Sequence, residues 1–338
     1  MSKILLYTID YPPNRGGVAR YLSALAGFFG SQMEVVGPEV ARSRWWSAMI
    51  DLVARRTTYD LLIVSHVLPI GTAALIAGIV TRKPFVVIVH GMDVGLAKQH
   101  AIKRFVVRMI LRHAKLVITN SNSLRSEVRD TFAVTRCLTA YPPVSLSAID
   151  VSRTCGTALR LLTVARLVAR KGHLRVLEAL VRLQREHPER SFEYVIVGDG
   201  PMRESIEQSI RNFGLKNVRM VIHANDDELA IIYASSDIFV LPIIQNEQDR
   251  EGFGMVFLEA AAHAVPSIAT DMSGVNEAIL NGKTGVLVPD GDIAALADTV
   301  YGLSVNPERR RALGKEAQRR VLEEFTPERQ FGQIRDLL

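Results

Sequence analysis

Short apolar runs alternate with longer amphipathic stretches along the whole chain, and no other feature limits the possible fold as much. The stretches between the runs, such as residues 17–30, 173–187 and 202–214, repeat apolar side chains at helical spacing. Alternation of this kind predicts parallel α/β sheets with helices on both faces. The runs that we predict to be strands are residues 3–9, 33–37, 60–65, 84–90 and 115–120 in the first half, and 159–167, 192–198, 218–222, 238–242 and 266–270 in the second.

The chain has 338 residues, more than one hydrophobic core usually organises, so two domains of about 150 residues are expected. Residues 142–158 contain Pro, Ser and Thr with little periodicity, which favours a linker. We therefore predict an N-terminal domain over 1–145, a C-terminal domain over 158–322, and a C-terminal helix over 323–338 that packs back toward the N-terminal domain. Open α/β sheets bind ligands beyond the carboxyl ends of their strands, so we expect two Rossmann-like domains that face each other across a cleft.

Composition excludes several other classes of protein. Hydrophobic residues make up 48% of the chain and charged residues 22%, which excludes a disordered or collagen-like protein. The two cysteines, Cys137 and Cys155, have no metal-ligand spacing, so neither a disulfide scaffold nor a zinc module is expected. The N-terminal apolar run is too short for a signal peptide, and we expect a cytoplasmic protein.

Residues 61–80 lack charged side chains over a length that spans a bilayer. Ser65, His66, Pro69 and Gly71 interrupt this segment near its middle. We therefore predict a buried strand over 61–65 and a buried helix over 71–80 rather than a transmembrane helix.

Positive charge is concentrated in the first half of the chain. Residues 1–150 carry 18 Lys and Arg against 9 Asp and Glu, a net +9, whereas residues 151–338 carry 23 against 26, a net −3. Such a basic half suits nucleic acid, anionic lipid or a phosphorylated small molecule. Nucleic acid is not expected, because aromatic residues are 7% of the chain and are not interleaved with the basic ones.

Two segments carry the basic residues that we single out. No acidic residue occurs between positions 94 and 126, where Arg104, Arg108, Arg112 and Lys115 recur at helical spacing. Trp45 and Trp46 lie in a second basic stretch. Both segments suit an anionic membrane surface, at the inner face of the membrane, or a lipid-phosphate acceptor. A solvated helix face with the tryptophans in the core explains them equally well.

The strongest local signal is the segment Glu251-Gly-Phe-Gly-Met-Val-Phe-Leu-Glu259, which follows a predicted strand and leads into a helical run. Glycines permit close backbone approach, and the amides of Gly254, Met255 and Val256 fall at the predicted helix N-terminus. Such a terminus favours a phosphate or a sugar oxygen. An ordinary loop and helix with two surface carboxylates accounts for the spacing equally well.

Residues 251–292 resemble the donor-binding signature of the family-4 glycosyltransferases, which are retaining enzymes of the GT-B fold that use nucleotide-activated sugars. Further segments are similar to the family in the expected order: Asn14-Arg-Gly-Gly-Val-Ala-Arg20, His90-Gly-Met-Asp93, Ala114-Lys-Leu-Val-Ile-Thr-Asn-Ser121, Arg166-Leu-Val-Ala-Arg-Lys171-Gly and Gly198-Asp-Gly-Pro201. The chain departs from the family at the junction Tyr141-Pro-Pro-Val-Ser-Leu and within 220–226, where a common glycine is replaced.

The resemblance implies a role for each of these positions. Glu251 would hold sugar hydroxyls and stabilise positive charge in the transition state, and His90 would contact the transferred sugar or the acceptor. Glu259 would bind the ribose. The donor would also contact Gly16, Gly17, Arg166, Lys171, Gly198, Gly254, Met255 and Val256. Arg166 and Lys171 follow the first strand of the second domain, where cationic side chains can neutralise a leaving diphosphate. We accordingly expect no acidic metal-binding cluster of the Asp-x-Asp kind, no metal and no cofactor.

These observations predict a retaining glycosyltransferase that moves a hexose-type sugar from a UDP- or GDP-sugar to a lipid-linked or surface-glycan acceptor. A different GT-B enzyme, such as a sugar-nucleotide epimerase, and a transferase with a soluble acceptor are the alternatives among enzymes. A basic nucleic-acid-binding or glycan-binding protein is the alternative outside them.

Overall fold

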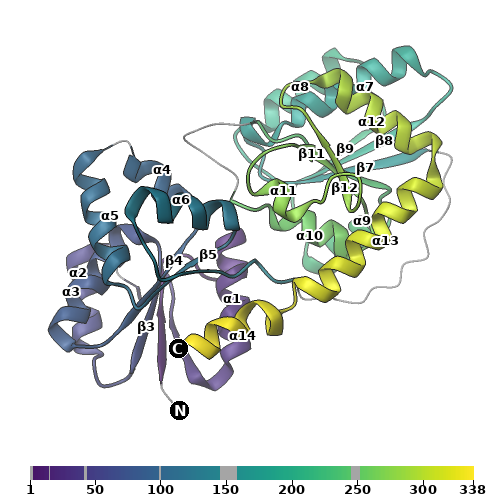
Figure 1. Ribbon diagram of the computed structural model, residues 1–338. Helices are drawn as coiled ribbons and strands as arrows, with labels where there is room; N and C mark the ends of the chain where they lie inside the picture. Colours follow the sequence, from purple (N-terminus) through teal and green to yellow (C-terminus); the bar gives the residue numbers. More distant parts are fainter. Residues whose placement is uncertain (1–2, 15, 42–43, 99, 145–157, 245–251) are drawn as a thin grey trace. The chain divides into compact units, whose positions relative to one another are not determined.

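The computed structural model describes residues 3–14, 16–41, 44–98, 100–144, 158–244 and 252–338. By its internal contacts the chain divides into two units. The first comprises Met1–Pro143, Glu247–Phe253 and Phe325–Leu338, and the second comprises Val144–Asn246 and Gly254–Glu324. Figure 1 shows the helices and strands of both units.

The described part of the first unit holds a six-stranded parallel sheet in the order β2-β1-β3-β4-β5-β6. Its strands are β1 (Ile4–Tyr7), β2 (Met33–Val36), β3 (Leu61–Ser65), β4 (Phe85–Val89), β5 (Leu116–Thr119) and β6 (Cys137–Thr139). Its helices are α1 (Gly17–Phe29), α2 (Trp45–Ala54), α3 (Thr72–Thr81), α4 (Met92–Lys98), α5 (Ala101–His113), α6 (Asn122–Phe132) and α14 (Pro327–Leu337).

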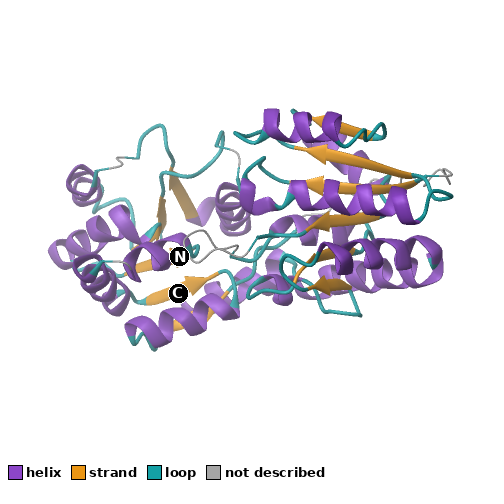
Figure 2. Ribbon diagram, turned by 90° about the horizontal axis from the view of Figure 1, so that it is seen from above, coloured by secondary structure: helices purple, strands orange, loops and turns teal. Residues whose placement is uncertain are grey.

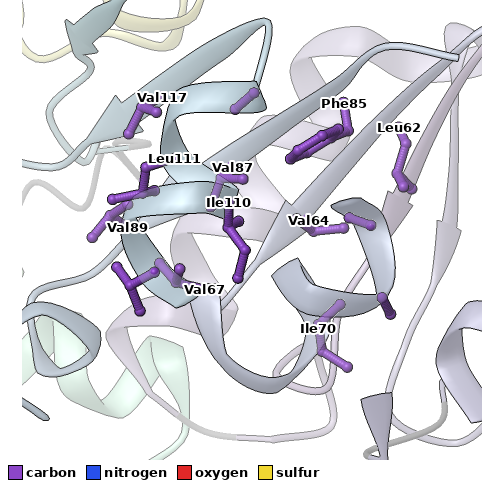
Figure 3. Close-up of a cluster of buried hydrophobic side chains, with 14 of the residues drawn as sticks. Leu62, Val64, Val67, Ile70, Phe85, Val87, Val89, Ile110, Leu111 and Val117 are labelled. Carbon is purple, nitrogen blue, oxygen red and sulfur yellow. The ribbon is translucent and has the colours of Figure 1, made fainter. Parts of the chain in front are cut away.

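Helices cover both faces of this sheet (Figure 2), and each face has its own core. One core joins α2, α3, α5 and α6 to the strands. Figure 3 shows part of this core, where Ile110 and Leu111 of α5 lie near Val87 and Val89 of β4. The other core joins α1 and α14, with Phe331 of α14 buried against Tyr21 of α1. Because both faces are buried, the strands read as continuous apolar runs, as parallel strands do.

The second unit holds, in its described residues, a six-stranded parallel sheet in the order β12-β11-β10-β7-β8-β9. Its strands are β7 (Leu159–Val164), β8 (Phe192–Val197), β9 (Val218–Val221), β10 (Ile238–Leu241), β11 (Ser267–Thr270) and β12 (Gly285–Val288). Its helices are α7 (His173–Glu186), α8 (Arg203–Asn212), α9 (Asp226–Ala234), α10 (Met255–Ala262), α11 (Val275–Ala278), α12 (Ile293–Val305) and α13 (Pro307–Glu324). Apolar residues of α7, α8 and α12 bury the sheet on one side.

The predicted α/β class is confirmed, and so are the ten predicted strands. The strands β6 and β12 were not predicted: β6 has only three residues, and β12 lies among the Gly and Pro residues of 282–291, a composition typical of a turn. Residues 61–80 form β3, a tight turn over Val67–Gly71 and most of α3, as expected, but the expectation that this helix is buried is only partly right, because Ile79 and Val80 are 67% and 61% exposed. No helix in the described part of the chain is long and apolar enough to cross a bilayer.

Three aromatic side chains, one from each of the three chain segments that form the first unit, pack against one another. Tyr141 lies 5.2 Å from Phe253 and 5.5 Å from Phe325, and Phe253 lies 5.8 Å from Phe325, measured between ring centroids. Gln330 of α14 also accepts a hydrogen bond from the Tyr141 backbone (2.9 Å). This aromatic cluster therefore anchors Phe253 and the C-terminal helix to the N-terminal sheet.

Candidate active site

In the second unit, the loops after β7 and β10 meet at the carboxyl edge of the sheet. These strands are neighbours, and the chain continues from β7 through β8 and β9 on one side and from β10 through β11 and β12 on the other. Gly172 adopts φ 69°, and a Cβ there would lie 2.0 Å from the Pro242 carbonyl oxygen. The Ile244 amide donates to the Arg170 carbonyl (2.7 Å). A strand pair at which the order reverses in this way is the usual ligand site of an open α/β sheet.

Arg166 and Lys171 stand at the two ends of the β7 loop. Arg166 is exposed, whereas Lys171 is buried in the 3₁₀ turn Ala169–Lys171 that leads into α7. His173 supports this loop, because its Nε2 donates to the Arg166 carbonyl oxygen (3.2 Å). Burial and the nearby Lys171 charge lower the pKa of His173 to about 4, although the bond to Arg166 raises it. The ring is therefore neutral near pH 7. Sequence reasoning missed this role, and the only signal was its place directly after Lys171-Gly172.

Gly198 lies beside the same loop, where close packing leaves no room for a side chain. Its φ is 142°, and a Cβ would lie 2.1 Å from the Ala165 carbonyl oxygen. The amide of Leu167 donates to the Asp199 carbonyl (2.9 Å). The segment 198–200 therefore holds the chain on both sides of Arg166, which accounts for the glycine at position 198 without a ligand.

Helix α10 begins at the β10 side of this edge, as the spacing of the glycines predicts. Gly254 is its N-cap with φ 84°, Met255 and Val256 are its first residues, and no described side chain caps it. The first turn holds no acidic residue. An anion or a sugar oxygen would be stabilised at this positive end of the helix.

Glu259 lies one turn into α10 and is partly buried. The buried Tyr233 hydroxyl donates to its Oε2 (2.9 Å), and the Tyr233 ring stacks on His263 with centroids 5.6 Å apart. Tyr233 therefore orients the carboxylate. Nothing in the sequence pointed to this tyrosine, which lies 26 positions earlier.

In the first unit, polar residues follow neighbouring strands at the carboxyl edge. His66 follows β3, His90 follows β4 and Asn120 follows β5, and Val89 pairs with Thr119, so His90 and Asn120 come next in the same register. Gly16 and Gly17 follow β1, where Gly16 is the N-cap of α1. A Cβ at Gly16 would meet no atom of the described residues within 4 Å, so their packing does not require this glycine.

His90 is held by a hydroxyl rather than by a carboxylate. Ser65 Oγ lies 3.1 Å from His90 Nε2 and 3.3 Å from His66 Nδ1. Burial, with a smaller effect of the neighbouring His66, lowers the pKa of His90 to about 3. The Tyr21 ring meets the imidazole edge-on at 5.9 Å. His90 is therefore a neutral, oriented hydrogen-bonding group. In the sequence, Ser65 and His66 stand out only as interruptions of an apolar run.

Glu251 lies outside the described residues, but its neighbours are placed in the first unit. A Cβ at Gly252 would lie 2.9 Å from Asn120 Nδ2 and 3.2 Å from the His90 carbonyl oxygen. Phe253 is buried in the aromatic cluster. Gly252 thus packs beside His90 and Asn120, whereas Gly254 and Glu259 belong to the second unit.

The expected acceptor surface lies on the outer faces of α2 and α5. Arg104, Arg108 and Arg112 are exposed along α5, together with Ile102 (80% exposed) and Phe105 (65%). Trp45 and Trp46 are 45% and 47% exposed at the start of α2, so the alternative that places them in the core is wrong. The expectation that Lys115 continues the stripe is also wrong. Helix α5 ends at His113, and Lys115 Nζ donates to the Leu338 backbone oxygen (2.7 Å).

One Asp-x-Asp spacing does occur, at Asp290-Gly291-Asp292, contrary to the expectation above. Asp290 pairs with Arg175 (2.6 Å), and Asp292 caps α12 by accepting from the Ala295 amide (2.8 Å). Both carboxylates are thus used in the fold. No group of three or more metal-ligating side chains occurs among the residues that the structure describes.

Comparison with known proteins identifies the family. Residues 151–320 match the model of the glycosyl transferases group 1, and residues 29–147 match that of glycosyltransferase family 4. A GDP-mannose-dependent alpha-(1-6)-phosphatidylinositol monomannoside mannosyltransferase of Mycolicibacterium smegmatis is 29% identical over 92% of this chain and 91% of its own. An N-acetyl-alpha-D-glucosaminyl L-malate synthase of Bacillus anthracis is 26% identical over 82% of this chain and 74% of its own.

Solved structures agree on the fold. Anabaena Alr3699/HepE in complex with UDP and glucose superposes with a TM-score of 0.79 at 19% identity, over 99% of both chains. The family matches cover both units, and the two parallel sheets are those of the GT-B architecture. The chain therefore belongs to glycosyltransferase family 4 and is a glycosyltransferase with two Rossmann-like domains.

Proposed function

We propose that the protein is a metal-independent, retaining glycosyltransferase that transfers a hexose-type sugar from a UDP- or GDP-sugar to a lipid-linked or surface-glycan acceptor. The observation that carries the proposal is the meeting of the Arg166–Lys171 loop with the loop that leads into α10, at the reversal of strand order in the second unit. Two cationic side chains and an uncapped helix N-terminus at one sheet edge suit a nucleoside diphosphate.

In this proposal Arg166 and Lys171 neutralise the diphosphate as it leaves, which replaces the usual metal ion. The amides of Met255 and Val256, and those at Gly16 and Gly17, contribute further donors. Glu259, oriented by Tyr233, accepts hydrogen bonds from the ribose hydroxyls. The acceptor attacks the face from which the phosphate departs, and the phosphate takes the acceptor proton, so that configuration is retained.

At the reaction centre Glu251 stabilises the oxocarbenium-like charge, while His90 binds a hydroxyl of the transferred sugar or of the acceptor. Burial holds the His90 ring neutral, so it acts through hydrogen bonds and not through charge.

We expect Glu251→Gln to lower kcat at least about 100-fold with little change in donor KM, since the negative charge of Glu251 acts mainly in the transition state. A large rise in KM at unchanged kcat would move Glu251 to donor binding.

A lipid-linked acceptor is supported by the surface of α5 and by the first relative, whose name specifies a phosphatidylinositol monomannoside. Exposed Ile102 and Phe105 beside Arg104 and Arg108 suit an anionic lipid surface. The protein would then act in the cytoplasm, at the inner face of the membrane. The L-malate synthase relative supports a soluble acceptor as the second candidate.

A donor screen tests the proposal. The protein is mixed with UDP-, GDP- and ADP-sugars in EDTA, and both its Tm and the release of nucleotide are followed. We expect one UDP- or GDP-sugar to raise the Tm and to be turned over in EDTA, with Arg166→Ala reducing turnover about 100-fold. Turnover that EDTA abolishes and magnesium restores would refute the metal-independent mechanism. A product whose anomeric proton shows inversion would refute retention.

A further inference from the structure

The hydroxyl of Ser65 touches two histidines, and one of them is the proposed sugar-contacting residue. Ser65 is the last residue of β3 and is fully buried. His66 follows it with φ 76° and ψ 115°, a conformation that residues other than glycine rarely adopt. This turn places the His66 ring 6.1 Å from the His90 ring, with Ser65 Oγ within hydrogen-bond distance of both.

A serine hydroxyl has one hydrogen, so it can donate to only one of the two rings. If it donates to His90 Nε2, His66 must donate to it from Nδ1, and neutral His90 then carries its hydrogen on Nδ1. If it donates to His66 Nδ1, His90 carries its hydrogen on Nε2 instead. The tautomers of the two histidines are therefore linked through Ser65.

We propose that Ser65 and His66 are positioning residues that fix His90 in the Nδ1–H tautomer. Hydrogen bonds donated by a hydroxyl are shorter on average than those donated by a ring N–H, and the contact to His90 Nε2 (3.1 Å) is shorter than that to His66 Nδ1 (3.3 Å), which favours donation of the serine hydrogen to His90. Among the described residues, Nδ1 of His90 has no hydrogen-bond partner, so its N–H remains for a ligand. His90 then presents a donor to an oxygen of the sugar or phosphate, rather than an acceptor. This role rests on the proposed function, whereas the tautomer itself does not.

Nuclear magnetic resonance of the protein labelled with ¹⁵N-histidine reads the tautomer directly, because the protonated and unprotonated ring nitrogens have different shifts. The His90 signals are assigned by their loss in His90→Gln. We expect Nδ1–H at His90 in the wild type and a mixture of the two tautomers in Ser65→Ala. His66→Asn, which keeps an N–H donor and tolerates positive φ, should retain the wild-type tautomer, whereas His66→Ala should not.

Turnover of the donor gives the second readout. Ser65→Ala and His66→Ala should lower kcat about tenfold with donor KM changed less than twofold, and His66→Asn should recover most of the loss. Thr119→Val is the matched control, since it removes a buried hydroxyl at the end of β5, which bonds to the backbone oxygens of Ser121 and Leu138 and to the Cys137 thiol rather than to a histidine. It should leave both the tautomer and kcat unchanged.

Nε2–H at His90 in the wild type, or an unchanged tautomer in Ser65→Ala, would overturn the proposal. An equal loss of kcat in Thr119→Val would show that the effect on turnover is one of packing. A wild-type tautomer as expected together with no turnover of any nucleotide sugar would refute the proposed function and leave the assignment of the tautomer standing.

Discussion

The Glu259 carboxylate accepts a hydrogen bond from the Tyr233 hydroxyl, and this contact decides how the residue can act. A carboxylate that such a donor holds in one orientation presents its oxygens at fixed positions, which suits the two adjacent hydroxyls of a ribose. His90 and His173 follow the same rule, because a serine orients the first and the Arg166 carbonyl orients the second. At the scale of the residue, the orientation of each of these side chains is therefore set by a hydrogen-bond partner, which for Glu259 and His90 lies 25 or more positions away in the sequence.

Tyr233→Phe should raise donor KM about three- to tenfold at nearly constant kcat, because the loss of one hydrogen bond costs about 1 kcal/mol of binding. Glu259→Ala should raise it further. Steady-state rates of nucleotide release measure both. Tyr194→Phe is the matched control, since Tyr194 is buried in the same unit and donates to Thr163 (2.8 Å) away from α10. A fall in kcat at constant KM in Tyr233→Phe would remove Glu259 from donor binding.

At the scale of the element, the short turn Ala169–Lys171 is the part that the proposed chemistry depends on most. It carries Lys171, receives the Ile244 amide at Arg170, and ends at Gly172 against the Pro242 carbonyl. Gly172 adopts φ 69° and has no room for a side chain. The position of Lys171 thus depends on this glycine, which follows it directly.

Gly172→Ala should lower the free energy of unfolding of the second unit by about 2–4 kcal/mol, through left-handed strain and displacement of Pro242. It should also lower turnover, because Lys171 moves. Urea unfolding followed by circular dichroism measures the first effect. Gly302→Ala, in α12 with no atom within 4 Å of the new Cβ, should stabilise by about 0.5–1 kcal/mol. Equal stability of the two variants would contradict this account of the loop.

At the scale of the whole molecule, each unit contains one histidine that folding keeps neutral, His90 in the first and His173 in the second. Their folded pKa values, about 3 and about 4, lie below the ordinary value of 6.5. The unfolded chain therefore binds more protons at acid pH. The stability contributed by each neutral ring is complete above pH 6.5 and is lost as the pH falls toward the folded pKa.

Between pH 7 and pH 5 this loss should be about 2 kcal/mol for His90, from 1.4 kcal/mol per pH unit below 6.5. Both tryptophans of the chain, Trp45 and Trp46, lie in the first unit, so urea unfolding followed by tryptophan fluorescence reports that unit. His90→Gln should reduce the difference between the two pH values by about 2 kcal/mol. His113→Gln, which replaces an exposed histidine of the same unit, should leave this difference unchanged. An unchanged difference in His90→Gln would mean that the ring is protonated in the folded state at pH 5.

The basic first half should bind anionic vesicles and not neutral ones, and high salt should weaken this binding. Replacing Arg104, Arg108 and Arg112 with Ala should cost about 3 kcal/mol, or roughly 100-fold in partitioning. Co-sedimentation with the vesicles measures this partitioning. Arg190, Arg309 and Arg311, three exposed arginines of the second unit, give the control with the same change in charge. Failure of the wild type to bind either vesicle at low salt would favour the soluble acceptor.

The alternation of apolar runs and helices was sufficient to predict the fold, because local burial on both faces of a parallel sheet leaves a pattern in each strand. It placed all central strands and the starts of α1, α7 and α10. The strands Cys137–Thr139 and Gly285–Val288 were not predicted. The first has only three residues, and the second lies between Gly282 and Gly291 with Pro289 after it, so that its composition is typical of a turn until it pairs with β11.

The sequence also indicated the positions of Arg166, Lys171, His90 and the glycines, through motifs that are contiguous in the chain. It could not show that Tyr233 donates to Glu259, that His173 donates to the Arg166 carbonyl, or that Ser65 lies between two histidines, because only the folded chain brings these groups together. It likewise left the exposure of Trp45 and Trp46 open. A residue type and its neighbours suggest what a side chain can do, whereas its hydrogen-bond partner and its access to solvent are set only when distant segments meet.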